Sequence, residues 1–315
     1  MYVSIVVPCY NEERNIAPFY VALETICKQV SGKIEVIFVN DGSEDETSRE
    51  LQKLYEQNNE VVRVVEFSRN FGKEAAIIAG LTSSKGTYVT IIDADLQQNP
   101  KYLLDMLQFL EEHKEYDAVA ACQVKRKESK LLAFYKNCFY RLMNRITEIN
   151  LVHSASDFRI LRRCVVDAIM ELPERCRFSK GIFAWVGFTT HYMPYEVEER
   201  ASGQSKWSFS RLMVYAIDGI VAFSSTPLLI SSIMGMIFCL IAVIVMVATL
   251  VKTIFWGEPV AGYPTIITTI LFVGGTQLFV LGILGQYMAK TYTETKQRPH
   301  YIIKRRLQQE LEENS

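Results

Sequence analysis

The first hundred residues alternate between apolar runs rich in β-branched residues and longer stretches with apolar positions at helical spacing. Four runs, each ended by polar or turn residues, predict strands at residues 2–11, 33–42, 61–70 and 87–95. The stretches between them predict helices at residues 15–30, 45–57 and 72–84, with Asp45 or Glu46 near the start of the second. This order predicts an α/β domain with a doubly wound, mostly parallel sheet, whose ligand site lies off the carboxyl ends of the strands.

Two uncharged runs, residues 227–251 and 264–289, add a second kind of structure. A helix of about 24 residues is about 36 Å long, which exceeds a hydrocarbon core of about 30 Å. Two buried helices of a soluble protein are the alternative, but uncharged runs of this length are rare in soluble domains. We therefore expect two transmembrane helices.

The charges that flank these runs predict their orientation. The connecting loop, residues 253–263, holds Glu258 but no Lys or Arg, whereas residues 290–306 are rich in both. By the positive-inside rule, the N-terminal domain and both termini are expected in the cytoplasm, at a bacterial-type plasma membrane. Met1 leads directly into a strand-like run without a basic region or a cleavage site, so we expect no secretory signal.

Net charge and cysteine spacing argue against several classes of protein. The net charge of −1 gives no reason to expect a nucleic-acid partner. Seven cysteines are scattered along the 315 residues without a CxxC pair or another metal-binding spacing. This pattern fits a reducing compartment better than a disulfide framework.

Two amphipathic stretches precede the membrane runs. Residues 130–149 carry apolar side chains at helical spacing, with Arg141 and Arg145 among the basic positions, and predict a helix in the membrane interface or one packed on the core. Residues 208–226 allow the same two interpretations and lead directly into the first run. Small residues of the second run, such as Gly274 and Gly282, would let helices of a homo-oligomer pack closely.

The expected organisation has four parts. They are a catalytic domain at residues 1–207 that includes the helix at 130–149, a juxtamembrane helix at 208–226, two transmembrane helices at 227–289, and a charged cytoplasmic tail at 290–315.

Acidic residues gather at the ends of the predicted strands. Asp93 and Asp95 are one residue apart, so on an extended strand both carboxylates would face one side and could reach one ion. Two such ligands leave room around Mg²⁺ or Mn²⁺ for water and a substrate diphosphate. Asp also caps turns and helices, and the spacing alone does not decide between the two roles. Two more acid-rich strand ends, at residues 6–13 and 40–47, favour the metal site.

Four motifs in order, VVPCYNEERNI, FVNDGSEDET, FSRNFGKEAAIIAGL and IIDADLQQNP, resemble the glycosyltransferase family 2 domain, which has the GT-A fold. The later SDFRI, RASGQSKWSF and paired apolar runs extend the resemblance over most of the chain. Within the family, the chain is most similar to the polyprenyl-phosphate hexosyltransferases, which include dolichyl-phosphate mannose synthases and bactoprenol glucosyltransferases.

The resemblance implies an inverting transfer of a hexose from a nucleotide sugar, with UDP-glucose favoured, to a polyprenyl phosphate at the cytoplasmic membrane face. It implies a Mg²⁺ or Mn²⁺ site at Asp93, Asp95 and Gln97. It assigns nucleotide-sugar binding to Pro8, Tyr10, Glu12, Asp41, Lys73, Asp93, Arg200 and Lys206. In these assignments Asp41 contacts the base or ribose, and Lys73 lies near the pyrophosphate.

Two assignments carry specific alternatives. Arg200 and Lys206 lie in a glycine-containing loop that could fold over the diphosphate, or could bind anionic lipid headgroups. By the resemblance, Asp157 is the catalytic base beside the acceptor. It could instead cap a helix that begins near Phe158, a role worth about 1 kcal/mol.

Other functions remain as alternatives. Mannose or aminoarabinose could replace glucose as the transferred sugar. A processive synthase is disfavoured, because such enzymes use more membrane helices and a QxxRW motif, which this chain lacks. A membrane-anchored nucleotide-sugar-binding scaffold without turnover is disfavoured by Asp93, Asp95 and Asp157.

Overall fold

The computed structural model describes residues 1–123, 141, 144–147, 152, 155–175, 177–196, 219–256 and 262–308. The strands are β1 (Tyr2–Cys9), β2 (Lys33–Asn40), β3 (Val62–Phe67), β4 (Tyr88–Ile91), β5 (Ala118–Gln123), β6 (Ala155–Arg162), β7 (Thr190–Tyr195) and β8 (Ile303–Leu307). The helices are α1 (Ile16–Cys27), α2 (Thr47–Gln57), α3 (Lys73–Ser83), α4 (Tyr102–Glu112), α6 (Arg163–Glu171), α7 (Ser179–Trp185), α9 (Thr226–Trp256) and α10 (Tyr263–Thr295). The predicted strands and helices of the first hundred residues are all present.

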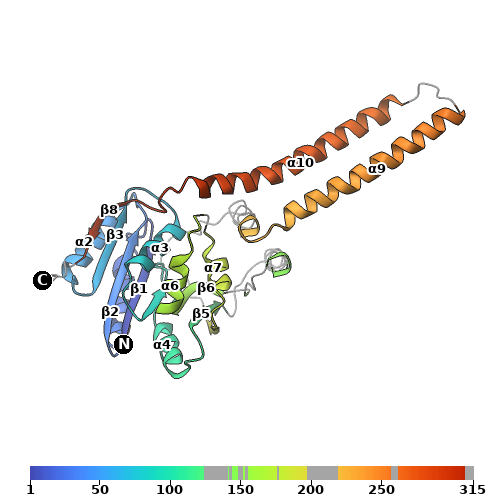
Figure 1. Ribbon diagram of the computed structural model, residues 1–315. Coiled ribbons are helices and arrows are strands. Elements are labelled where there is room, and N and C mark those ends of the chain that lie inside the picture. Colours follow the sequence, from blue (N-terminus) through green and yellow to red (C-terminus); the bar gives the residue numbers. More distant parts are fainter. Residues whose placement is uncertain are drawn as a thin grey trace.

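An eight-stranded mixed sheet forms the centre of the domain, in the order β7-β5-β6-β4-β1-β2-β3-β8 (Figure 1). Strands β1 to β4 are mutually parallel where they pair, as predicted, whereas β6 runs antiparallel to both β4 and β5. The GT-A, Rossmann-like fold class expected from the sequence is thereby confirmed.

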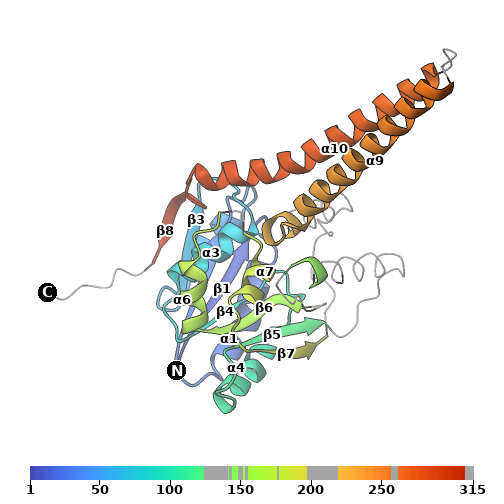
Figure 2. The same ribbon diagram turned by 45° about the vertical axis from the view of Figure 1, so that its right-hand side comes forward.

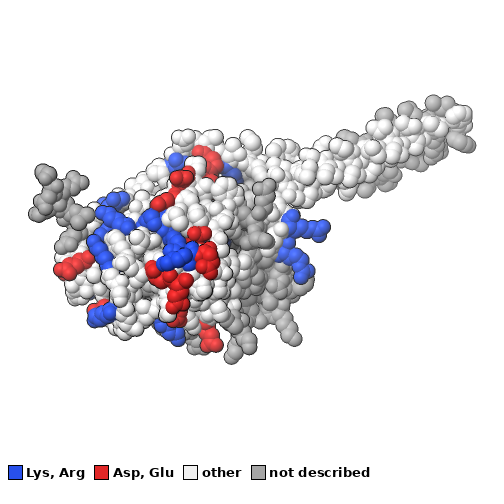
Figure 3. All heavy atoms as spheres, turned by 60° about the horizontal axis from the view of Figure 1, so that its bottom comes forward, with Lys and Arg blue, Asp and Glu red and all other residues white. Residues whose placement is uncertain are grey.

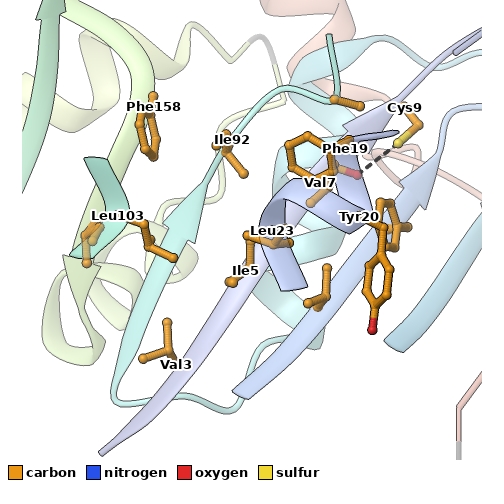
Figure 4. Close-up of a cluster of buried hydrophobic side chains, with 14 of the residues drawn as sticks. Val3, Ile5, Val7, Cys9, Phe19, Tyr20, Leu23, Ile92, Leu103 and Phe158 are labelled. Carbon is orange, nitrogen blue, oxygen red and sulfur yellow. Dashed lines mark hydrogen bonds between the residues drawn. The ribbon is translucent and has the colours of Figure 1, made fainter. Parts of the chain in front are cut away.

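The sheet is buried on both faces at its central strands, which explains why β1 and β4 are mainly apolar. Successive residues of β1 point to opposite faces. Val3, Ile5 and Val7 pack with residues of α1, α2 and α4 in the larger core (Figure 4). Val6 faces the other way and packs with residues of α3, α6 and α7. The domain is therefore a three-layer sandwich.

The order of the strands reverses direction at β1, which is the topological switch point of the sheet. The chain passes from β1 outward to β2 and β3, and then returns to the other side of β1 as β4. In open α/β sheets, ligands bind outside the carboxyl ends of the strands at such a point. The segments after Cys9 and Ile91 border this position.

A hairpin of two long helices, α9 and α10, extends away from the sheet in both ribbon views (Figures 1 and 2). Phe238 and Phe272 pack edge to face across it, with ring centroids 5.4 Å apart. Segments Thr226–Val245 and Phe272–Thr295 are long and apolar enough to cross a membrane and are almost wholly exposed. In a space-filling view, the hairpin beyond its base is free of charged side chains among the described residues (Figure 3).

The chain after the hairpin returns to the domain, which the sequence analysis did not foresee. Strand β8 pairs antiparallel with β3 at the edge of the sheet (Figure 2). The Tyr301 ring stacks on Phe67, with centroids 4.8 Å apart, and Arg305 lies 3.1 Å from the buried Glu66 carboxylate. Part of the expected tail, residues 303–307, is thus a strand of the catalytic sheet.

Several sequence predictions concern residues outside the described part of the chain. They include most of the helix at 130–149, most of the juxtamembrane stretch before Gly219, the loop with Arg200 and Lys206, and the connecting loop around Glu258. Those predictions stay as they were made.

Candidate active site

Asp93 and Asp95 lie in a turn after β4 and not on the strand itself. The strand ends at Ile91, so the argument that strand alternation brings the two carboxylates together is wrong. The turn is built by its own polar groups: the backbone N–H of Gln97 donates to Asp95 Oδ1 at 3.1 Å, and Leu96 has a φ of 59°. Asp93, Asp95 and Gln97 are all partly exposed there.

Gln98 fixes this turn to the neighbouring strand. Its Oε1 accepts the backbone N–H of Asp93 at 3.2 Å, and its Nε2 donates to Ser156 Oγ at 3.1 Å. Gln98 and Ser156 are both buried. Gln98 thus supports the turn that carries Asp93 and Asp95, called the acidic turn below. This role has no signal in the sequence, because Ser156 is distant in the chain.

Asp157 lies on β6, opposite the acidic turn. Antiparallel pairing places Ile91 opposite Arg159, so Asp93, two residues after Ile91, and Asp157, two residues before Arg159, approach each other. Helix α6 begins only at Arg163. The alternative in which Asp157 caps a helix is therefore excluded.

Lys73 joins the two acids. Its ammonium lies 2.7 Å from Asp93 Oδ1, 2.9 Å from Asp93 Oδ2 and 2.8 Å from Asp157 Oδ2. Lys73 opens α3, Asp93 follows β4 and Asp157 belongs to β6, so three segments converge on one ammonium group. All three residues are expected at the site from their motifs, but no sequence pattern predicts this contact between them.

The charges of this cluster are mutually stabilised. Burial raises the pKa of Asp157, but the positive charges of Lys73, Lys180 and Arg159 outweigh it and hold that pKa well below its usual range. Burial lowers the pKa of Lys73, but Asp157 and Asp93 raise it by more. At neutral pH, Asp157 is an anion and Lys73 a cation.

Asp41 holds the loop that leads to Lys73. Its carboxylate is buried and accepts the backbone N–H groups of Phe71 at 2.6 Å and Gly72 at 2.9 Å. Burial raises the pKa of Asp41, while the two backbone donors and Arg69 act against that rise. Gly42 follows with a φ of 63°, and a Cβ there would lie 2.2 Å from the carbonyl carbon of Arg69. The described contacts of Asp41 are thus to protein backbone, and its contact with a nucleoside stays a prediction.

The other predicted nucleotide-binding residues border the same edge of the sheet. Pro8 is at the end of β1, and Tyr10 and Glu12 follow it; all three are half-buried. The backbone N–H of Glu12 donates to Thr47 Oγ1 at 2.8 Å, and Asn11 Oδ1 accepts the N–H of Glu44 at 2.9 Å. These bonds place the acid-rich ends of β1 and β2 side by side.

A second unforeseen contact links the site to α7. The Glu74 carboxylate accepts both the hydroxyl and the backbone N–H of Ser179. Glu74 follows Lys73 in the chain, and burial raises its pKa. Phe178, just before α7, packs against Phe223 near the base of the hairpin, with centroids 6.0 Å apart. No sequence motif signals this contact, because its partners are about a hundred residues apart.

The donor groups suit a hard divalent cation. Among the described residues, no cluster of three His, Cys, Asp or Glu side chains forms a complete metal site. Magnesium is nevertheless usually held by one or two carboxylates together with substrate phosphates, and Asp93 and Asp95 are partly exposed carboxylates in one turn. The Lys73 ammonium at Asp93 also demonstrates that this position accommodates a positive charge. The residues therefore fit a divalent cation.

Similarity to known proteins covers both the catalytic domain and the hairpin. Residues 4–170 match the family described as glycosyl transferase family 2. A Bacillus subtilis protein named as a glycosyltransferase, CsbB, is 42% identical over 96% of this chain and 91% of its own length. The prophage bactoprenol glucosyl transferase homolog of Escherichia coli is 37% identical, over 97% of this chain and 99% of its own length. The bactoprenol glucosyl transferase of Shigella phage SfX is 37% identical, over 97% of this chain and its whole length.

Solved structures support the fold alone. Mannosyl-3-phosphoglycerate synthase from Rubrobacter xylanophilus superposes with a TM-score of 0.50 at 17% identity, over 70% of this chain and 73% of its own. The sequence matches over more than half of the chain decide the relationship. The chain belongs to glycosyl transferase family 2 and is a glycosyltransferase.

Proposed function

We propose that this enzyme transfers glucose from UDP-glucose to a polyprenyl phosphate at the cytoplasmic face of the membrane, with inversion at the anomeric carbon. The observation that carries the proposal is the full-length similarity to relatives named bactoprenol glucosyl transferase, because it includes the apolar hairpin as well as the catalytic domain. Two long apolar helices next to the site suit an acceptor that resides in the membrane.

The acidic turn would bind the nucleotide sugar through a divalent cation. Asp93 and Asp95 would supply carboxylate ligands, with Gln97 beside them. When bound, Mg²⁺ or Mn²⁺ would neutralise negative charge on the diphosphate. Pro8, Tyr10, Glu12 and Asp41 would form the nucleoside side of the pocket, since they border the same carboxyl edge of the sheet.

The acceptor needs little activation. A phosphate monoester has a second pKa of about 6, so at neutral pH its oxygens are largely ionised and nucleophilic. One of these oxygens would attack the anomeric carbon as the bond to the UDP oxygen breaks. The charged Asp157 would orient the acceptor and stabilise positive charge on the sugar ring.

Cationic side chains would assist departure of UDP. Lys73, Arg200 and Lys206 would contact the diphosphate, which gains negative charge as the glycosidic bond breaks. Such stabilisation lowers the barrier because it is strongest in the transition state.

The hairpin would hold the site close to the lipid phosphate. Ser179 bonds to Glu74 beside the cluster, and Phe178 packs on Phe223 three residues before α9 begins. Since β8 returns to the catalytic sheet, both ends of the hairpin lie on the same side, which suits two membrane crossings.

A panel of radiolabelled nucleotide sugars tests the proposal. Each would be offered to purified protein in vesicles that contain polyprenyl phosphate, and lipid-soluble label would be counted. We expect label from UDP-glucose to enter the lipid phase. Label from a mannose or aminoarabinose donor would instead support the alternative sugar. Lipid label from none of the donors would contradict the proposed transfer.

A further inference from the structure

Lys73 makes contacts that binding to a diphosphate alone does not explain. Its ammonium touches both oxygens of Asp93, at 2.7 and 2.9 Å, and one oxygen of Asp157, at 2.8 Å. One side chain therefore connects the proposed metal ligand with the proposed acceptor residue. Without a cation between them, these two carboxylates would repel each other.

An ammonium and a divalent metal ion compete for such oxygens. A lysine ammonium is a compact point charge that binds carboxylates at about 2.7–2.9 Å, whereas Mg²⁺ requires about 2.0–2.1 Å. Because Lys73 contacts both Asp93 oxygens, a metal ion that binds Asp93 would share an oxygen with the ammonium and bring a second cation next to it. Repulsion between the two cations then favours complete departure of the lysine.

Lys73 is able to move away. Its side chain is 41% exposed and has a flexible four-carbon stem. It follows Gly72, around which nothing lies within 4 Å of an added Cβ. Glu74, by contrast, is anchored by Ser179, so the backbone of α3 stays fixed while the Lys73 side chain changes position.

We propose that Lys73 is a positioning residue that occupies the cation position between Asp93 and Asp157 in the metal-free enzyme, and that it transfers to the substrate diphosphate when the divalent cation binds. This inference rests on the proposed function, because it uses both the metal and the diphosphate. The nucleotide sugar would bring the metal and, at the same time, the anion that receives the displaced lysine.

Binding of Mn²⁺ to the purified full-length protein without nucleotide or acceptor tests the exchange. Free Mn²⁺ would be measured by its electron paramagnetic resonance signal for wild type, Lys73→Met and Lys85→Met. Lys85→Met is the matched control, since it removes the same charge from an exposed side chain beyond the other end of α3. We expect Lys73→Met to bind Mn²⁺ roughly tenfold more tightly than both other proteins.

The sign of the change separates this role from a structural one. A damaged fold would bind Mn²⁺ more weakly, not more tightly. Lys73→Gln, which keeps a hydrogen-bond donor for the two carboxylates, should show the same tightening. With Mn²⁺ present, UDP should bind roughly tenfold more weakly to Lys73→Met than to Lys85→Met, because the diphosphate has lost a cation.

Two results would count against the exchange in different ways. Unchanged or weaker Mn²⁺ binding by both Lys73 variants, with normal binding by wild type in the presence of UDP, would overturn the inference and leave the proposed function intact. If wild type bound no Mn²⁺ even with UDP present, the proposed metal site would be contradicted, and the exchange with it.

Discussion

Asp157 contacts Lys73 in the site and does not cap a helix, since α6 begins only at Arg163. Its replacement should therefore affect the reaction more than folding. We expect Asp157→Asn to keep the fold and the affinity for UDP-glucose while transfer slows by at least roughly a hundredfold, the scale of a positioned acid–base group. Single-turnover transfer and nucleotide binding measured on the same preparation check this. Turnover close to wild type in a well-folded variant would remove Asp157 from the mechanism.

Neither Lys73 nor Asp157 is expected to change its protonation state near neutral pH. The pKa of Asp157 is depressed, so its carboxylate stays charged above its ordinary pKa of about 3.9 and protonates only at still lower pH. The pKa of Lys73 is raised, so its charge persists beyond about pH 10.4. The pair is therefore intact throughout the range from about pH 5 to 8.

The transfer rate in that range should instead follow the acceptor phosphate and fall below about pH 6, where the phosphate gains a proton. A pH–rate profile with two acceptors whose phosphate pKa values differ checks this. The midpoint should move with the acceptor. A midpoint that is the same for both acceptors would assign the titration to a group of the enzyme.

Most residues of the site can be found from the sequence, but their contacts cannot. Asp93, Asp95 and Asp157 occur in motifs, and strand ends are where a ligand site is expected. Gln98, Glu74 and Ser179 escape such reasoning because each is defined by a partner distant in the chain. The position of Lys73 between two acids likewise depends on the antiparallel register of β6 with β4, which no local pattern encodes.

At the scale of elements, β8 is the least predictable part of the sheet. Its sequence, IKRRL, has only two apolar residues and lies in a strongly charged segment. Charged side chains are common on edge strands because they discourage further pairing. Strands β1 to β3 are predictable because they are buried on both faces and therefore apolar, whereas β4 was expected to extend to Asp95 and ends at Ile91.

The residues just before β8 should stabilise the domain through Tyr301. Tyr301→Ala removes the ring that stacks on Phe67, and we expect a loss of about 1–3 kcal/mol in the free energy of unfolding. Ile302→Ala is the control, since that side chain is 54% exposed. Thermal denaturation in detergent should show a midpoint several degrees lower for Tyr301→Ala than for the control. Equal midpoints would mean that the stacking of Tyr301 on Phe67 contributes little.

At the scale of the whole molecule, the hairpin and β8 together constrain the topology. If α9 and α10 cross a membrane, the catalytic sheet and β8 must lie on one side, and residues 253–263 on the other. In a cysteine-free background, Glu258→Cys should react with an impermeant maleimide in intact cells, while Lys296→Cys should react only after lysis. The reverse pattern would invert the proposed orientation.

The most direct test of the central claim is transfer from labelled UDP-glucose in vesicles with and without polyprenyl phosphate. We expect label in the organic phase that requires the lipid phosphate, is abolished by excess EDTA and is severely reduced by Asp95→Asn. Label released only as free glucose, or transfer that continues at the wild-type rate in excess EDTA, would show that these carboxylates do not serve metal-assisted transfer to a lipid phosphate.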